Sequence, residues 1–437
     1  MALRTTATTL FTTLPECLDR ETPAAVRLID IEQSTTELRL PASSSGNPYR
    51  LLLALVRRNG SPLGWTVLPV SPDGTVSLDV LTAVELAGSP GELGDLPAEA
   101  PVIATDGLGQ PRGDSTSKPA AGSLLSVVVP TCANVEQVVR CVEAILACGD
   151  ESLEIVVVEN RPVLSTVERT LEERFGGDER VRYVEEHHRG SSQARNAGLH
   201  AARGDLVAFT DDDVLVDQAW VRVVRAAFAR SPSVDCVTGL ILPFELETPT
   251  QVLVERFASL GKGFTQRTYS LDDPPLDQPL FPYTVGYFGS GANMAFRTGV
   301  IRSLGGFDPA LGASTRARGG EDLDIYIRLL HAGGRLAYEP SAIVWHRHPD
   351  TAARLRQQVF GYGVGLGAML TKQIIAGPDR LSIVSRTPQG IRYFTDPGSR
   401  KNAARGPTFP RNLSRLERVG VACGPLAYLA SCLGRSR

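Results

Sequence analysis

From residue 123 to about residue 240, two kinds of hydrophobic pattern alternate along the chain. Short continuous apolar runs are typical of strands buried on both faces, and apolar residues recurring every three or four positions are typical of helices. The alternation predicts an α/β fold with a mostly parallel sheet flanked by helices. Strands are expected at 124–129, 154–158, 181–184, 206–210 and 234–240, and helices at 135–146, 167–175, 191–202 and 217–230.

The pattern differs on either side of this region. Residues 3–98 consist of short strand-like pieces separated by turn residues, and Asn59-Gly60 between the apolar pieces 51–56 and 65–70 is a strong β-hairpin signal. Beyond residue 240 the pattern is mixed. It is strand-like at 287–296 and 335–345, helical at 321–332 and 352–375, and without regular periodicity afterwards.

These patterns divide the chain into four parts. Residues 1–98 are expected to form a β-rich accessory domain, and residues 99–122, rich in Pro, Gly, Ser and Asp, a linker. Residues 123–350 form the α/β domain, and residues 351–437 a helical C-terminal extension.

Composition narrows the class of protein. The chain has 437 residues, 42% of them hydrophobic, with a formal net charge of −3. This length supports a large core and more than one domain, and the near-neutral charge gives no reason to expect nucleic acid as a partner. The seven cysteines include no CxxC pair, so we interpret them as reduced cytosolic thiols rather than disulfides or zinc ligands.

Targeting signals are weak. The N-terminus lacks the long apolar stretch of a signal peptide, and no stretch reaches the ~18–20 apolar residues of a membrane span. We therefore expect a cytoplasmic protein. The apolar segment 419–433 is flanked by arginines, so it either lies at the surface of an anionic membrane, as a peripheral contact at the inner face, or packs against the protein.

Three consecutive carboxylates, Asp211, Asp212 and Asp213, directly follow the expected strand 206–210. Like charges at this separation repel, and the repulsion grows as water is excluded. A divalent cation with a preference for oxygen ligands, Mn²⁺ or Mg²⁺, would relieve it, and such ions commonly hold phosphates. The alternative is a solvated acidic turn.

Other polar residues follow neighbouring strands. Pro130 and Thr131 end the first strand, and Glu159 and Asn160 end the second. In parallel sheets ligands bind beyond the carboxyl ends of the strands, so these residues and the three aspartates are expected at one edge of the sheet. That convergence predicts a binding site.

Four segments resemble glycosyltransferase family 2, whose enzymes have the GT-A fold and transfer a sugar from a nucleotide-sugar donor. The opening strand reads SVVVPT at 126–131, and GSSQARNAG at 190–198 is similar to the family's ARNxG signature. The aspartates 211–213 fit the DxD motif, and GGEDLD at 319–324 is similar to the ED motif that bears the catalytic base. The resemblance covers about residues 123–349, and the order and spacing of the motifs make it specific.

The resemblance implies how the donor is held. Asp211 would contact the ribose or uridine side, Asp213 would coordinate the metal that bridges the diphosphate, and Asp212 would support them. Arg195 would face the nucleotide or its phosphates, with a surface salt bridge as the alternative. Pro130 and Thr131 would line the nucleotide site.

Glu159 stands where the family usually has an aspartate that hydrogen-bonds the base of the nucleotide. The segment Glu159-Asn160-Arg161-Pro162 replaces a more acidic turn, which leaves the identity of the base open. The alternative is a carboxylate that caps the next helix.

The resemblance also implies an inverting mechanism with Asp322 as general base. Asp322 would open a helix whose buried face is Leu323, Ile327 and Leu330, and a helix N-terminus favours an ionised carboxylate. Its neighbour Glu321 would orient the acceptor or Asp322 itself. The alternative is ordinary acidic charge at a helix N-terminus.

Three further segments carry interpretations. His346 follows the strand 335–345 and would complete the metal site, although His348 would share its face in an extended chain. Residues 289–294 resemble the floor of the family's acceptor site. The glycine-rich segment 361–367 lacks the strand-turn-helix context of a dinucleotide fingerprint, and its spacing of small residues by four predicts close helix packing.

Two other classes of protein remain alternatives. A sugar nucleotidyltransferase would need a Gly-rich, basic loop after the first strand, where this chain has Pro130-Thr131-Cys132-Ala133. A nucleotide-sugar-binding scaffold without catalysis would have no use for a base such as Asp322. The sequence does not specify the sugar, the nucleotide or the acceptor, which is a glycan, a lipid-linked compound or a small molecule. Uridine diphosphate is the family's commonest nucleotide.

Overall fold

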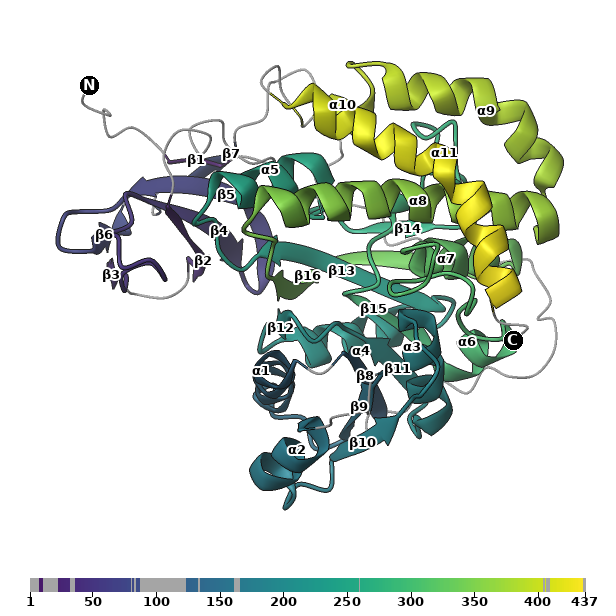
Figure 1. Ribbon diagram of the computed structural model, residues 1–437. Coiled ribbons are helices and arrows are strands. Elements are labelled where there is room, and N and C mark those ends of the chain that lie inside the picture. Colours follow the sequence, from purple (N-terminus) through teal and green to yellow (C-terminus); the bar gives the residue numbers. More distant parts are fainter. Residues whose placement is uncertain are drawn as a thin grey trace, which may run out of the picture.

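The computed structural model describes residues 8–10, 23–31, 36–79, 81, 84–86, 123–132, 134–160, 166–258, 260–403, 405 and 409–434. The expected linker 99–122 lies outside the described residues. In Figure 1 the N-terminal strands lie at one end of the molecule, the α/β layers occupy the centre, and the last helices cover one side.

A nine-stranded sheet forms the centre of the described structure, in the order β10-β9-β8-β11-β15-β13-β16-β12, with β14 also paired to β16. The first four strands are parallel, β13 is parallel to β16, and β15 runs antiparallel between β11 and β13. The predicted α/β fold is confirmed. The strands are β8 (Leu125–Thr131), β9 (Leu153–Glu159), β10 (Val181–Glu185), β11 (Leu206–Phe209), β12 (Val214–Val216), β13 (Cys236–Pro243), β14 (Arg267–Tyr269), β15 (Met294–Arg297) and β16 (Leu336–His346).

Helices cover both faces of this sheet, because alternate residues of the buried strands point to opposite sides. Val127 and Val129 of β8 face a core formed with α1, α2 and α4, and Val128 faces a core formed with α3, α6 and α7. The helices of the two layers are α1 (Val135–Leu146), α2 (Val167–Phe175), α3 (Ser191–Ala201), α4 (Trp220–Arg230), α6 (Thr298–Ser303) and α7 (Glu321–His331).

The strand expected at 287–296 is largely wrong. Only its end belongs to β15, and it is preceded by the short 3₁₀ helix η4 (Val285–Tyr287) and a turn. Gly289 has a φ of +131°, a backbone conformation that side-chain-bearing residues rarely adopt, and this breaks the extended chain. The turn brings Gly291 against the site described below.

The N-terminal strands form small sheets that pack on the central one. The hairpin of β4 (Leu51–Arg58) and β5 (Ser61–Pro69) is confirmed, with Asn59 and Gly60 at positive φ in the turn. One face of this sheet, including Leu53 and Trp65, shares a core with β13, β16 and α5 (Pro249–Ala258). The remaining strands are β1 (Thr8–Leu10), β2 (Ala24–Asp30), β3 (Glu37–Arg39), β6 (Thr75–Ser77) and β7 (Val84–Leu86).

The C-terminal extension remains helical almost to its end. Helix α8 (Ala352–Ala376) is followed by α9 (Arg380–Thr395), α10 (Arg400–Ala403) and α11 (Arg411–Gly434), so helices continue beyond residue 375, where the sequence shows no regular periodicity. Sequence periodicity misses α11 because its contact face consists partly of glycines, which carry no hydrophobic signal.

Close packing of α8 and α11 explains these glycines, and it confirms the prediction made from their spacing. A Cβ at Gly363 or Gly367 would overlap backbone atoms of α11, and one at Gly420 or Gly424 would overlap those of α8. Pro425 lies inside α11. The carbonyl that its missing N–H leaves free, four residues earlier, lies against Gly367.

Helix α8 also corrects the expectation about membrane spans. Among the described residues it is the one helix long and apolar enough to cross a bilayer. Half of its apolar window is buried inside the protein, and a core helix of a folded domain shows the same character.

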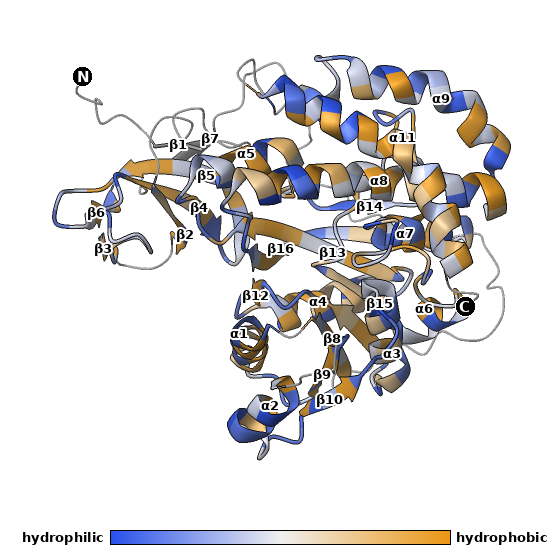
Figure 2. Ribbon diagram, in the orientation of Figure 1, coloured by the Kyte–Doolittle hydropathy of each residue, from blue (hydrophilic) through white to orange (hydrophobic). Residues whose placement is uncertain are grey.

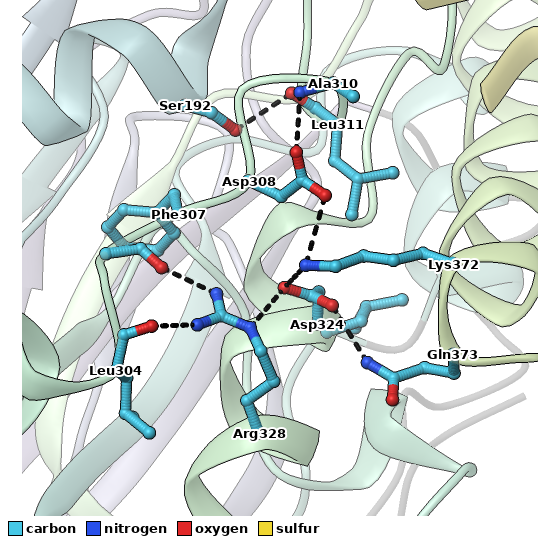
Figure 3. A network of polar contacts seen from close by, with 12 residues as sticks. Ser192, Leu304, Phe307, Asp308, Ala310, Leu311, Asp324, Arg328, Lys372 and Gln373 are labelled. Carbon is cyan, nitrogen blue, oxygen red and sulfur yellow. Dashed lines mark hydrogen bonds and ion pairs between the residues drawn. The ribbon is translucent and has the colours of Figure 1, made fainter. Parts of the chain in front are cut away.

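A buried polar network ties the extension to α7 (Figure 3). Asp324 is fully buried and accepts hydrogen bonds from Arg328 Nε at 2.7 Å, Lys372 Nζ at 2.6 Å and Gln373 Nε2 at 2.9 Å. Lys372 also pairs with Asp308 at 3.1 Å. Because Lys372 and Gln373 belong to α8, the network fixes that helix against the helix that begins at Glu321.

Replacing Asp324 should destabilise the protein. In Asp324→Ala, Lys372 and Arg328 remain buried with part of their charge uncompensated, and we expect a loss of about 3–5 kcal/mol in the free energy of unfolding. Urea denaturation followed by circular dichroism would measure it. The control Asp272→Ala removes an exposed carboxylate and should change stability by less than about 0.5 kcal/mol. Equal stability of the two variants would contradict this role of the network.

Candidate active site

The carboxyl ends of three neighbouring strands meet as the sequence predicts. Thr131 at the end of β8 lies opposite Glu159 at the end of β9 in the parallel register, with Pro130 one position earlier. The loop after β11 carries the aspartates, and Thr131 Oγ1 donates a hydrogen bond to Asp212 Oδ2 at 2.6 Å. The structure therefore brings Pro130, Thr131, Glu159 and Asp212 to one edge of the sheet.

Glu159 is fully buried in β9. The Tyr183 hydroxyl, on β10, donates to Glu159 Oε2 at 2.6 Å, a contact that the sequence pattern did not indicate. The alternative that Glu159 caps the next helix is wrong, because α2 has Thr166 as its N-cap residue. Glu159 is thus a buried carboxylate next to the first strand's end.

Arg195 connects the two acidic motifs. Its guanidinium, 5% exposed, donates through Nη2 to Asp211 Oδ1 at 2.8 Å and through Nη1 to Glu321 Oε1 at 2.6 Å. Burial lowers the pKa of Arg195, but the charges of Asp211, Glu321 and Asp322 raise it by more. The pKa is therefore above its ordinary value, and the guanidinium stays protonated. The alternative of a surface salt bridge is wrong, because the side chain is buried between the motifs.

Helix α3 positions Arg195 through its N-terminal turn. Gly190, with a φ of +137°, precedes the helix, and its N–H donates to Asn160 Oδ1 at 2.7 Å. Asn160 also donates to the carbonyls of Glu186 and His188. The second strand's end therefore holds the start of the helix that carries Arg195.

Glu321 faces α3. It is 7% exposed, and its Oε1 accepts hydrogen bonds from both Arg195 and the Ser191 hydroxyl, the latter at 2.7 Å. The structure thus engages Glu321 with Arg195 and Ser191, and its action on an acceptor stays a prediction. Its charge acts on Asp322 next to it.

Asp322 lies in the first turn of α7. Its Oδ2 accepts from the Gly291 N–H at 2.9 Å and its Oδ1 from the Leu323 N–H at 2.8 Å. Burial and the adjacent charge of Glu321 nevertheless raise the pKa of Asp322 to about 6. The helix N-terminus favours ionisation as expected, but the loss of water has the larger effect.

Gly291 was singled out only as part of a segment of small residues. A Cβ at this position would lie 3.1 Å from Arg195 Nη2 and 3.4 Å from Asp322 Oδ2. A side chain here would press on the Arg195 guanidinium, whereas glycine leaves it undisturbed and its N–H donates to the Asp322 carboxylate. The resemblance of 289–294 to an acceptor floor was the signal for this position.

Asp213 and His346 approach each other at the other end of the acidic loop. Strand β12 pairs with β16 so that Val214 lies opposite His346, and His346 Nε2 lies 3.7 Å from Asp213 Oδ2. His348 is buried, with Nε2 2.5 Å from Glu255 Oε1. The two histidine rings lie against each other, with 3.3 Å between their Nδ1 atoms, but His346 is the one beside Asp213, and His348 pairs with Glu255.

The three aspartates are only partly accessible, unlike a solvated turn: the side chains of Asp211 and Asp213 are 33% and 34% exposed. Burial, together with the charges of Asp213 and Asp211, raises the pKa of Asp212 to about 7 despite the hydrogen bond from Thr131. Burial likewise raises the pKa of Asp213, against the effect of His346. A cation would lower both pKa values.

Within the described part of the chain, no cluster of three or more His, Cys, Asp or Glu side chains has the geometry of a metal site. Asp213 and His346 nevertheless fit a divalent ion that takes its other ligands from phosphate oxygens and water, as Mg²⁺ and Mn²⁺ do in phosphate sites. The coordination of such a metal would be complete only when a phosphate-bearing molecule is also bound.

One correction concerns α7. Ile327 and Leu330 are buried as expected, but Leu323 is only half-buried. It contributes to the wall of a pocket together with Tyr362 and Leu366 of α8. Tyr362 lies in the glycine-rich segment. Burial raises the pKa of its hydroxyl, and the charges of Asp322, Asp213 and Asp211 raise it further.

The fold and this edge define an α/β protein whose acidic residues gather beyond the carboxyl ends of parallel strands. A family model described as "Glycosyltransferase like family 2" matches residues 121–361. This is more than half of the chain, and the chain belongs to that family.

Individual relatives match only part of the chain, at 26–37% sequence identity. A pre-mycofactocin glycosyltransferase of Mycobacterium tuberculosis is 37% identical over 164 residues, which cover 37% of this chain and 31% of that protein. A glucosyl-dolichyl phosphate glucuronosyltransferase of Haloferax volcanii is 26% identical over 230 residues, covering 51% and 69%. The chain thus spans about a third of the length of the first of these relatives.

Among solved structures, the mannosyltransferase PcManGT from Pyrobaculum calidifontis, in complex with GDP-Man and Mn²⁺, is similar with 18% identity and a TM-score of 0.44. The alignment covers 74% of this chain and 90% of that one.

Proposed function

We propose that this chain transfers a sugar from a nucleotide-sugar donor, most simply a uridine diphosphate sugar, to a hydroxyl acceptor with inversion at the anomeric carbon. One observation carries the proposal. The buried Arg195 joins Asp211, in the acidic loop after β11, to Glu321, next to Asp322. The acidic loop that would hold the donor and the carboxylate that would take the proton are thereby linked through one side chain.

The donor would lie along the carboxyl ends of β9, β8 and β11. Glu159 would accept a hydrogen bond from the base, and Pro130, Thr131 and Asp212 would border the nucleotide. Asp211, oriented by Arg195 at 2.8 Å, would contact the ribose. The diphosphate would then lie towards Asp213.

Asp213 and His346 would hold Mn²⁺ or Mg²⁺ against the diphosphate. A bound divalent cation would neutralise negative charge on the departing nucleoside diphosphate. The raised pKa values of Asp212 and Asp213 support this, because both carboxylates are held in a setting that disfavours their own charge.

Asp322 would accept the proton of the acceptor hydroxyl as that oxygen attacks the anomeric carbon from the side opposite the diphosphate. The Gly291 and Leu323 N–H groups fix its carboxylate, and a pKa of about 6 leaves it ionised near neutral pH yet basic enough to take a proton. Glu321 and Arg195 are positioning residues in this scheme.

The residues of this site fit a sugar nucleotidyltransferase or a donor-binding scaffold less well. A sugar nucleotidyltransferase would need a basic, Gly-rich loop after β8, and the residues there are Pro130, Thr131 and Cys132. A donor-binding scaffold would have no need of a carboxylate held by two backbone N–H groups at Asp322. The names of the two relatives describe different acceptors, so they do not choose one for this chain.

Donor binding should depend on the metal and on Asp213. In the wild-type protein, one nucleoside diphosphate or its sugar should raise the melting temperature by about 2–4 °C with Mn²⁺ and much less without it. Asp213→Ala should abolish the metal-dependent part, whereas the exposed-site control Asp272→Ala should keep it. Absence of any shift across a panel of donors, with or without Mn²⁺, would overturn the donor site.

Removing the base should stop transfer but not donor binding. We expect Asp322→Asn to lower the rate of transfer, or of donor hydrolysis by water, by about 10²–10⁴-fold with an unchanged donor-induced melting shift. In the wild type the rate should fall about tenfold per pH unit below pH 6 and level off above it, because only the ionised carboxylate accepts a proton. Full turnover by Asp322→Asn would show that another group is the base.

We further infer a cytoplasmic protein that contacts the inner face of a membrane through its C-terminal helices. Residues 351–437 contain 14 lysines and arginines against 3 acidic residues, a net charge of +11, whereas the rest of the chain carries −14. Figure 2 shows apolar residues among hydrophilic ones on α9 and α11. Exposed members of this surface are Leu381, Val384, Ile391, Val419, Leu426, Leu429 and Leu433.

Vesicle binding tests the membrane contact. The protein should sediment with vesicles containing anionic phosphatidylglycerol much more than with pure phosphatidylcholine, and less as salt rises. The triple variant Leu426→Glu, Leu429→Glu and Leu433→Glu should lose this binding. Leu276→Glu, at a fully exposed leucine outside the extension, should retain it. Equal binding by both variants, or no preference for anionic lipid, would contradict the contact.

A further inference from the structure

A large pocket lies between the α/β domain and the C-terminal extension. Its volume is about 810 Å³, within the range of cavities that bind drug-sized ligands. Its walls come from α5, β14 and η4 on one side and from α8, α9, α10 and α11 on the other. None of the residues that would hold the donor lines it.

The wall of the pocket includes the residue next to the proposed base, Asp322. Leu323, which directly follows Asp322, forms part of its wall, as do Tyr287 of η4 and Tyr362 of α8. Helix α8 crosses closely over the start of α7, since a Cβ at Gly320 would lie 2.5 Å from the Gly365 carbonyl oxygen. A molecule in the pocket would therefore present one end beside Asp322.

Hydrogen bonds between its opposite walls hold this pocket open. The Tyr393 hydroxyl of α9 donates to the Tyr287 hydroxyl of η4 at 2.8 Å, and Arg386 Nη1 donates to the Phe281 carbonyl at 2.8 Å. The Tyr283 hydroxyl donates to Asp379 at 3.2 Å. These polar contacts connect α9 to the α/β domain. The space between them is not filled by side chains, so the cavity is preformed.

Most of the wall is apolar or aromatic. Examples are Leu323, Leu366, Leu370, Ile383 and Phe394. A hydrated saccharide in such a pocket would leave many hydroxyl groups without partners, at a cost for each buried group. An apolar body gains free energy in proportion to the area it removes from water.

The charged groups in the wall are mostly cations. Lys262, Arg267, Arg386, Lys401 and Arg418 line the pocket with a single carboxylate, that of Glu417. Glu417 already pairs with Lys401 and, at 3.0 Å, with Arg405. Burial, with a smaller contribution from the charge of Lys401, lowers the pKa of Lys262 to about 8, and burial also lowers the pKa of Lys401 to about 8. An anion bound between these groups would offset their repulsion.

We propose that the pocket is the acceptor site and that the acceptor is an anionic amphiphile: a hydroxyl compound with an apolar or aromatic body and an acidic group such as a phosphate. The proposal rests on the proposed glycosyl transfer for its meaning, since the hydroxyl placed beside Asp322 is the atom that would attack the donor. The apolar body lies among the side chains of α8 and α9. The acidic group lies near Lys262 and Lys401.

Binding of a soluble probe tests the pocket without catalysis. The full chain should enhance the fluorescence of 1-anilinonaphthalene-8-sulfonate, an aromatic anion, with one saturable site. Geranyl phosphate and naphthyl phosphate are competitors with a prenyl and an aryl body. Whichever displaces the probe more strongly indicates the kind of apolar body that the pocket accepts. Neutral geraniol should compete at least about fivefold more weakly than geranyl phosphate, and maltose should not compete.

A matched pair of variants on α9 locates the site. Ile391 lines the pocket and is 61% exposed, whereas Leu381 is 80% exposed and lies outside the lining. Ile391→Glu adds a negative charge, which repels the anionic probe, and removes apolar surface. It should weaken probe binding about tenfold. Leu381→Glu should change it less than about twofold. Lys401→Met should weaken geranyl phosphate and leave geraniol unchanged.

The outcomes separate this proposal from the proposed function. If donor binding and donor hydrolysis are present but the probe does not bind, or binds equally to Ile391→Glu and Leu381→Glu, the acceptor proposal is overturned and glycosyl transfer stands. If the probe binds as expected and no donor binds, the pocket is real but the transferase assignment is overturned. Stronger competition by maltose than by geranyl phosphate would indicate a saccharide acceptor and contradict the proposal.

Discussion

The site depends on one buried ion pair system, the guanidinium of Arg195 between Asp211 and Glu321. Removing a charge from water is costly, and such a group is tolerated only when several hydrogen bonds and opposite charges compensate it. Here the compensation comes from the loop after β11 and from the first turn of α7, which are far apart in the sequence. The geometry of each acidic motif is therefore tied to the other, and neither carboxylate can move without leaving the arginine uncompensated.

The sequence predicted the sheet and its functional edge well, because these follow from local patterns. Continuous apolar runs specify buried parallel strands, and parallel strands bring their carboxyl ends together, so Thr131, Glu159 and Asp212 were expected to meet. The hairpin at Asn59-Gly60 follows from the backbone preference of two residues. Such features need no knowledge of distant contacts.

What the sequence did not reveal depends on contacts between distant segments. Arg195 was expected to face phosphates, but its partners lie on other elements that no periodicity identifies. The pKa of Asp322 reflects how much water the surrounding loops exclude, and the helix-terminus argument could give only one contribution to it. The bounds of α11 within the expected helical extension were not predicted, because glycines form part of its contact face and their role appears only when α8 lies against them.

The C-terminal extension changes what the sheet edge can do. Asp324 fixes α8 to α7 two residues after Asp322, so the extension is positioned by the same helix that carries the proposed base. An open edge of a sheet becomes a bounded site with the acidic donor face on one side and a cationic, apolar wall on the other. Opposite charges separated in this way would hold a cation and a diphosphate on the first side and an acidic amphiphile on the second. Under the two proposals, Asp322 would lie between the two ligands, as transfer from one to the other requires.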